Sequence, residues 1–124
     1  MATGRSATGY RARLAGRRGE VAAALWLMVK GYRILGFRLR TPHGEIDLLA
    51  RKGGVLAVVE VKLRGTAEAA LESVTWRQRQ RLRRAAEAYA AARAPLKGAA
   101  IRLDLMALAP RRWPCHIRDA WFGD

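Results

Sequence analysis

The segment GEIDLLARKGGVLAVVEVKLR, residues 44–64, decides the fold of this 124-residue chain. Polar and apolar residues alternate over 45–51, whereas 55–62 is a mostly apolar run rich in β-branched residues. Both patterns are typical of strands, and Gly53-Gly54 between them suits a two-residue turn with positive φ at both positions. The segment therefore predicts an antiparallel β-hairpin in which Lys52 pairs with Val55.

This turn also sets the register of the two strands. Asp47 then lies opposite Glu60, and Glu45 lies opposite Lys62. The aliphatic residues share the other face as three pairs: Ile46 with Val61, Leu48 with Val59, and Ala50 with Ala57. A slip of one residue would place acids against aliphatic side chains, which the two-residue period of a strand disfavours. The hairpin thus predicts one apolar and one charged face.

The charged face carries two acids that repel each other. Residues directly opposite in an antiparallel pair have Cβ atoms about 4.5–5.5 Å apart, and like charges there destabilise the sheet. A divalent cation between Asp47 and Glu60 would remove the repulsion, and carboxylate oxygens suit Mg²⁺ or Mn²⁺. Lys62 projects to the same side as Glu60 and would stabilise charge developing on a phosphate or orient a water. The alternative is that Lys62 neutralises Glu45 while Asp47 points into solvent.

These residues carry a resemblance to known nucleases. Asp47 followed by Glu60-Val61-Lys62 resembles the catalytic signature of the PD-(D/E)XK nuclease superfamily, with Ile46 in place of its proline. Further motifs resemble, in order, the YraN family of small bacterial proteins related to archaeal-type Holliday junction resolvases: Gly16-Arg17-Arg18-Gly19-Glu20, Gly31-Tyr32, Gly44-Glu45-Ile46-Asp47-Leu48, Val59-Glu60-Val61-Lys62 with Arg64, and Arg102-Leu103-Asp104. The resemblance covers nearly the whole chain from Gly16 to Phe122. It implies an α/β fold with a restriction-endonuclease-like mixed β-sheet flanked by helices.

The resemblance also implies a metal-dependent endonuclease. Mg²⁺ or Mn²⁺ would be held by Asp47, Glu60 and the backbone carbonyl of Val61, with Glu45 as a further ligand or a support for the ligands. Glu20 matches a glutamate of the first helix that approaches the metal in resolvase-like nucleases. The alternative for Glu20 is stabilisation of the helix dipole from the first turn.

Gln78 occupies a position where related nucleases place Lys or Gln to position the attacking water. YraN-like sequences usually have lysine there, so this chain departs from the pattern that it otherwise resembles. Thr75 and Gln78 also form a capping-box signature, and the two roles are compatible. The signature predicts that the second long helix covers 76–93, with Leu82, Ala85, Ala86 and Tyr89 facing the sheet.

Composition indicates a polyanionic partner. The chain has 24 Lys and Arg against 10 Asp and Glu, a net charge of +14 and a pI near 11.5. Such an excess favours nucleic acid, with an anionic membrane surface as the second candidate. An almost purely basic face of the second long helix, together with the arginine after the catalytic signature, is expected to bind phosphates; these residues are Arg64, Arg77, Arg79, Arg81 and Arg84.

Residues 1–18 contain five arginines and no acid, so we expect 1–15 to form a disordered basic arm before a single nuclease-like domain over 16–124. A first helix is predicted over 17–30, with its buried stripe at Val21, Leu25, Met28 and Val29. Strands are expected over 32–40, 99–108 and 115–120. The element order is then helix, three strands, helix, two strands.

These features lead to a functional expectation with one alternative. The chain is expected to be a cytoplasmic, Holliday junction resolvase-like endonuclease acting on DNA, including branched DNA. Relatives that resolve junctions work as dimers because two strands must be cut, so the resemblance makes a homodimer a possible partner arrangement. The alternative is a non-catalytic nucleic-acid-binding protein on the same fold. The lone Cys115 fits a reducing compartment, and no run approaches the roughly 18 apolar residues of a membrane span.

Overall fold

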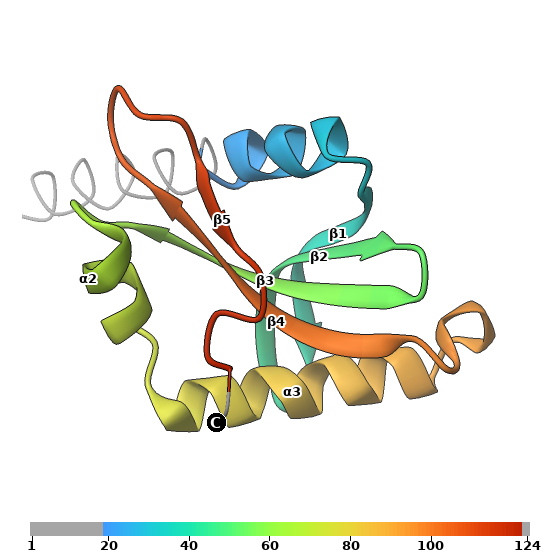
Figure 1. Cartoon of the computed structure of the whole chain (residues 1–124). Helices are drawn as coiled ribbons and strands as arrows, with labels where there is room; N and C mark the ends of the chain where they lie inside the picture. Colours follow the sequence, from blue (N-terminus) through green and yellow to red (C-terminus); the bar gives the residue numbers. More distant parts are fainter. Residues whose placement is uncertain (1–18, 123–124) are drawn as a thin grey trace, which may run out of the picture.

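A mixed five-stranded sheet with helices on both faces forms the protein (Figure 1). The computed structural model describes residues 19–122, so the expected basic arm over 1–15 lies outside the described residues. The strands are β1 (Arg33–Thr41), β2 (Gly44–Lys52), β3 (Val55–Leu63), β4 (Ala100–Leu108) and β5 (Cys115–Ile117). They lie in the order β1-β2-β3-β4-β5, and only β3 and β4 pair in parallel.

The helices enclose this sheet. A helix over residues 19–29, here called the N-terminal helix, covers one face, and α3 (Trp76–Ala91) crosses the other (Figure 1). The short helix α2 (Ala67–Glu72) and the 3₁₀ turn η1 (Ala94–Leu96) lie within the long connection between β3 and β4. The mixed α/β sheet and the predicted order of the strands and long helices are confirmed, whereas α2 is an additional helix and β5 ends at Ile117, short of the predicted 120. No helix in residues 19–122 is long and apolar enough to cross a membrane.

The central hairpin has the predicted register over most of its length. Leu48 pairs with Val59, and the ladder continues to Lys52 and Val55 at the turn. The turn itself differs from expectation, because Gly53 has a φ of 58° while Gly54 is not in the positive-φ region. One left-handed glycine is therefore enough to close this hairpin.

The hairpin opens beyond Leu48, and there one sequence prediction was wrong. Leu48 and Val59 pack beneath the N-terminal helix, but Ile46 packs with Leu82 on the α3 side instead of pairing with Val61. The β2–β3 ladder ends at Leu48, and Arg38 in the neighbouring strand has a left-handed φ of 47°. The regular alternation of side chains in β2 therefore breaks between Leu48 and Ile46, and Asp47 lies at the break.

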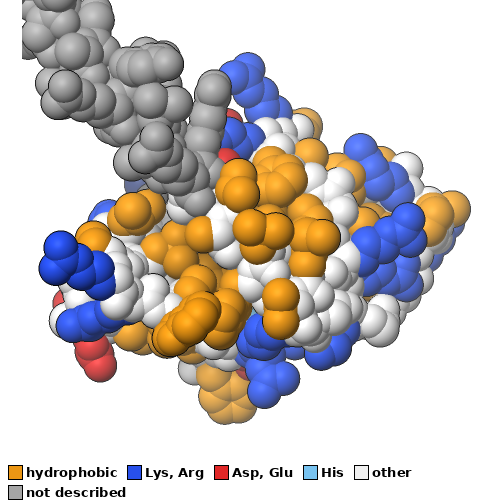
Figure 2. Space-filling view, turned by 90° about the horizontal axis from the view of Figure 1, so that it is seen from above, with side chains coloured by type: hydrophobic (Ala, Val, Ile, Leu, Met, Phe, Trp, Pro, Cys, Tyr) orange, Lys and Arg blue, Asp and Glu red, His pale blue; other side chains and the backbone are white. Residues whose placement is uncertain are grey.

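The N-terminal helix buries the opposite stripe to the one predicted. Its buried side chains are Ala23, Ala24 and Leu27, whereas the predicted stripe is 53–85% exposed: Val21, Leu25, Met28 and Val29. Small residues face the sheet because the helix lies close to it: a Cβ at Gly19 would be 3.1 Å from Leu108 Cδ1. This helix is apolar on both sides, so periodicity alone did not identify its inner face. Its outer side chains form an apolar patch edged by Lys and Arg (Figure 2).

A buried ionic network fastens the C-terminal segment to the sheet. Asp104 is fully buried and accepts two hydrogen bonds from Arg102, at 2.7 and 2.8 Å. His116 Nε2 lies 2.8 Å from the same carboxylate, and the Asp119 N–H donates to it at 3.0 Å. Burial alone would raise the pKa of Asp104, but these hydrogen bonds outweigh burial and lower it. Asp104 therefore remains ionised as an anchor for β5.

Candidate active site

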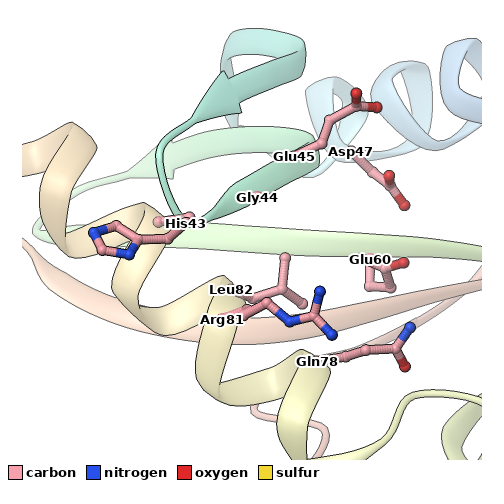
Figure 3. A pocket seen from close by; sticks show the side chains of 9 residues that line it. His43, Gly44, Glu45, Asp47, Glu60, Gln78, Arg81 and Leu82 are labelled. Carbon is pink, nitrogen blue, oxygen red and sulfur yellow. The ribbon is translucent and has the colours of Figure 1, made fainter.

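A cavity of about 150 Å³ opens where β2 and β3 separate, between the sheet and the first half of α3. Its apolar floor includes Leu82 and Ala85 of α3. Polar side chains from three segments line the rest, namely His43, Glu45, Asp47, Glu60, Gln78 and Arg81 (Figure 3). The break in the β2–β3 ladder thus brings predicted site residues from both the hairpin and α3 to one place.

Asp47 takes the place of a missing backbone partner. Its Oδ2 accepts a hydrogen bond from the Val61 N–H at 3.1 Å, beyond the end of the β2–β3 ladder. This bond turns the Asp47 carboxylate across the opening toward Glu60 (Figure 3). The opposed carboxylates predicted from the turn register are therefore close together, and one of them is oriented by the backbone of β3.

Glu60 is strongly perturbed by this setting. Burial and the neighbouring Asp47 raise the pKa of Glu60 to about 8, although Lys62 acts in the opposite direction. The Lys62 Nζ lies 3.5 Å from Glu60 Oε1, so the predicted neutralisation of Glu45 by this lysine is replaced by a contact with Glu60. At neutral pH a proton on Glu60 relieves the repulsion between the two carboxyl groups. A divalent cation could take over that role, because both groups supply hard oxygen ligands.

The other two candidate acids do not join this pair. Glu45 lines the cavity, but its carboxylate points away from Asp47 and Glu60 (Figure 3). Both oxygens of Glu20 lie 2.9 Å from Arg38 Nε, and Glu20 does not line the cavity. Within residues 19–122 no group of three or more His, Cys, Asp or Glu side chains is arranged to hold a metal. A metal here would depend on two carboxylates and backbone oxygen.

Helix α3 supplies the opposite wall. Gln78 completes the predicted capping box: its Oε1 accepts from the Thr75 N–H at 2.8 Å, and its own N–H donates to Thr75 Oγ1 at 3.2 Å. The amide group of Gln78 nevertheless lines the cavity, with its nitrogen on the side of Glu60 (Figure 3). Arg81 projects from the next turn of α3 into the same space. Gln78 can therefore cap α3 and act in the candidate site at the same time.

The remaining predicted arginines are divided between surfaces. Arg77 and Arg84 are exposed on α3, one turn either side of Arg81. Arg79 instead donates to the Val74 carbonyl at 2.8 Å and lies over the Trp121 ring, 5.6 Å from its centroid. Arg64 donates to the Leu63 carbonyl and lines a separate small cavity near Trp113. The basic surface beside the candidate site therefore consists of Arg77, Arg81 and Arg84.

His43 also lines the cavity, and it lies in the turn between β1 and β2. Its backbone N–H donates to Thr41 Oγ1 at 3.1 Å, and Thr41 Oγ1 donates to the Gly44 carbonyl at 2.8 Å. These bonds shape the β1–β2 turn that leads to Asp47. The one sequence signal for His43 was its place two residues before Glu45.

Comparison with known proteins assigns the chain to a family. The model of the family described as "Uncharacterised protein family UPF0102" matches residues 19–108. The chain belongs to the UPF0102 family. A UPF0102 protein of Caulobacter sp. (strain K31) is 67% identical over 117 residues, covering 94% of this chain and 84% of the relative. A UPF0102 protein of Caulobacter vibrioides (strain NA1000 / CB15N) is 64% identical over 124 residues, covering 99% of each.

UPF0102 is the YraN family, so this membership confirms the resemblance to YraN proteins inferred from the order of the motifs. A more distant UPF0102 protein, from Parvibaculum lavamentivorans, is 50% identical and covers 95% of this chain and 89% of the relative. The residues matched by the UPF0102 model include the whole candidate site from His43 to Arg81, whereas β5 lies beyond them.

Proposed function

We propose that this UPF0102 protein is a metal-dependent DNA endonuclease with a restriction-endonuclease-like core, related to archaeal-type Holliday junction resolvases in the PD-(D/E)XK superfamily. The observation that carries the proposal is the pair of facing carboxylates of Asp47 and Glu60 at the opening of the hairpin. Two carboxylates that face each other lower the stability of the fold, so we attribute their presence to function. Lys62, 3.5 Å from Glu60, completes the set of residue types that phosphodiester hydrolysis uses.

The proposed cofactor is Mg²⁺ or Mn²⁺. The residues that would hold it are Asp47, Glu60 and the backbone carbonyl of Val61, and the raised pKa of Glu60 supports this set. Repulsion between the two carboxylates favours a proton on Glu60 near neutral pH. A bound cation would supply positive charge in place of that proton. When bound, the cation would polarise a phosphoryl oxygen and promote attack by water.

The chain's own side chains have separate tasks in this proposal. The Lys62 ammonium stabilises negative charge that develops on the phosphate. Gln78 holds a water by hydrogen bonding from the α3 wall, and Arg81 grips the neighbouring phosphate through its planar guanidinium. Arg77 and Arg84 extend this contact along the DNA backbone. The net charge of +14 draws the polyanion to the site.

The proposed substrate is DNA, and branched DNA in particular. Resolution of a branch requires two cuts, so we propose that two copies of the chain act together as a homodimer. Action on cellular DNA would place the protein in the cytoplasm.

A second candidate function is a non-catalytic nucleic-acid-binding protein on the same fold. It is favoured by the small number of acids in the cavity, since Glu45 points away and Glu20 is paired with Arg38. Such a protein would use Arg77, Arg81 and Arg84 but would have no need of Asp47. Cleavage separates the two functions.

The experiment incubates the full-length protein with four-way, nicked and linear DNA in Mn²⁺, in Mg²⁺ or in chelator. The nuclease should cut at least one substrate only with metal, and Asp47→Ala should reduce cleavage by at least about a hundredfold. Glu68→Ala is the matched control, because Glu68 is an exposed acid on α2 away from the cavity. Wild-type protein that binds these substrates but cuts none would leave only the binding function.

A further inference from the structure

A second and larger cavity lies at the other end of α3. Its volume is about 370 Å³, against about 150 Å³ for the candidate active site. Four apolar or aromatic residues line it, namely Leu35, Tyr89, Pro95 and Leu96, together with three arginines. None of its lining residues is acidic. It therefore combines an apolar interior with a concentrated positive charge.

The three arginines are Arg33 of β1, Arg51 of β2 and Arg93 after α3. Arg33 lies directly opposite Arg51 in the β1–β2 register, where two like charges lower the stability of a sheet. This arrangement is the positive counterpart of the carboxylates Asp47 and Glu60. An anion between the guanidinium groups would remove the repulsion, as a cation would at the other cavity.

Backbone carbonyls hold two of these arginines in place. Arg51 donates to the carbonyl of Gly53 at 3.1 Å and to that of Pro95 at 2.8 Å. Arg93 donates to the Tyr89 carbonyl at 3.1 Å, and its guanidinium carbon is 3.4 Å from the centroid of the Tyr89 ring. Neutral carbonyls orient the side chains without cancelling their charge. Both guanidinium groups therefore keep their positive charge for a ligand.

The apolar part of the cavity suits a flat ring. Leu96 is buried, while Leu35 and Tyr89 are half-buried and pack against the core beneath α3. A volume of about 370 Å³ is in the range of small-molecule sites and admits one nucleobase with its sugar. Unstacked bases commonly lie on aromatic rings and on arginine planes, and the lining of this cavity includes one residue of each kind, Tyr89 and Arg93.

The two cavities lie along the same flank of α3. Leu82 and Ala85 line the first and Tyr89 lines the second, and residues spaced by three or four share one side of a helix. Along β2 the sites are marked by Asp47 and Arg51, four residues or about 13 Å apart. A stacked strand advances about 3.4 Å per nucleotide, so about four nucleotides span this distance.

We propose that the second cavity binds one unstacked nucleotide of the DNA strand that passes through the candidate active site. Its phosphate lies among Arg33, Arg51 and Arg93, and its base enters the apolar interior beside Leu35 and Leu96. This inference rests on the proposed function and deepens it: the substrate has an unpaired nucleotide within about four positions of the cleaved bond. Branched DNA with a single-stranded arm or gap offers such nucleotides, whereas an intact duplex does not.

The test measures binding of five-nucleotide oligothymidylates to the full-length protein in chelator. A single abasic nucleotide is moved through each position in turn. Loss of one stacked base should weaken binding about tenfold at one position and much less elsewhere. Arg33→Gln should lower the slope of log K against log salt by about 0.7, the value for one phosphate contact in a single strand. Arg111→Gln is the matched control, since Arg111 is exposed and lines none of the three cavities described.

A second arm identifies the ligand by its chemistry. Thymidine 5′-monophosphate should shift the amide NMR signals of Leu35 and Leu96 at lower concentration than inorganic phosphate or decyl phosphate does. Tighter binding of decyl phosphate would overturn the nucleotide assignment in favour of a lipid-like anion. The strand could bind through Arg81 and yet lose the same affinity at every abasic position, with Arg33→Gln and Arg111→Gln giving the same salt slope. That result would overturn nucleotide binding in the second cavity alone. Failure of the strand to bind at all would instead overturn the proposed function on which this inference rests.

Discussion

Replacement of Glu60 by glutamine is the sharpest test of the carboxylate pair. The side chain of Glu60 is 16% exposed, and burial and Asp47 raise its pKa to about 8 from an ordinary value of 4.5. Between these two pH values the folded protein binds a proton that the unfolded chain has released. The free energy of unfolding therefore falls as the pH rises from about 4.5 to about 8, with a slope of up to about 1.4 kcal/mol per pH unit.

The size of the effect follows from the same shift. A full shift from 4.5 to about 8 corresponds to an upper bound on the order of 5 kcal/mol, and sharing of the proton with Asp47 reduces it to about 2–4 kcal/mol. Glu60→Gln is neutral at every pH and nearly isosteric. Compared with wild type it should be about equally stable at pH 5 and more stable at pH 8, by that reduced amount.

Urea denaturation in chelator at pH 5, 6.5 and 8 measures this difference. Glu87→Gln is the control, because Glu87 is an exposed acid on α3 and should follow the wild-type curve. Repeating the pH 8 measurement in millimolar Mg²⁺ or Mn²⁺ should raise wild-type stability and leave Glu60→Gln almost unchanged. Parallel curves for wild type and Glu60→Gln between pH 5 and 8 would refute the reasoning that burial and Asp47 hold a proton on Glu60.

Four further predictions concern other parts of the molecule. Mg²⁺ and Mn²⁺ should raise the melting temperature of wild type but not of Asp47→Asn, and an unchanged wild type at millimolar metal would exclude a functioning metal site. In chelator, Asp47→Ala should bind branched DNA more tightly, because it removes a negative charge that faces the polyanion, and Lys62→Ala should bind more weakly, because it removes a positive charge. Affinity shifts in the same direction for both variants would contradict this. Combined Arg77→Ala, Arg81→Ala and Arg84→Ala should lower the slope of log K against log salt by about 2–3, whereas an unchanged slope would remove α3 from the DNA surface. Leu27→Ala should cost about 2–5 kcal/mol in urea denaturation, and Leu25→Ala, at 57% exposure, less than about 1; equal losses would mean that Leu25 is buried between copies of the chain.

The exposed stripe of the N-terminal helix shows where periodicity reaches its limit. Val21, Leu25 and Met28 have the spacing of a buried face, yet Ala23 and Leu27 make the contact with the sheet. A hydrophobic pattern reports which residues share a side of a helix. It does not report how close the sheet is, and at close range small side chains pack best.

Local chemistry was enough to predict the central hairpin and the start of α3. A tight turn at Gly53 sets which residues face each other, and this register alone predicts that Asp47 and Glu60 are opposed. Thr75 and Gln78 satisfy each other within one helical turn. Such features depend on residues near in sequence, and the chain specifies them directly.

Tertiary structure decided what depends on distant segments. Glu20 pairs with Arg38 because of how the N-terminal helix lies against β1. Arg64 lies away from the candidate site because of the position of the end of β3. The break in β2 that sends Ile46 to the α3 side follows from the end of a ladder, not from its sequence pattern. The second cavity joins Arg33, Arg51 and Arg93 from three separate segments. Their charges were visible in the sequence, but only the packing of α3 across the β1–β2 strands brings them to one cavity.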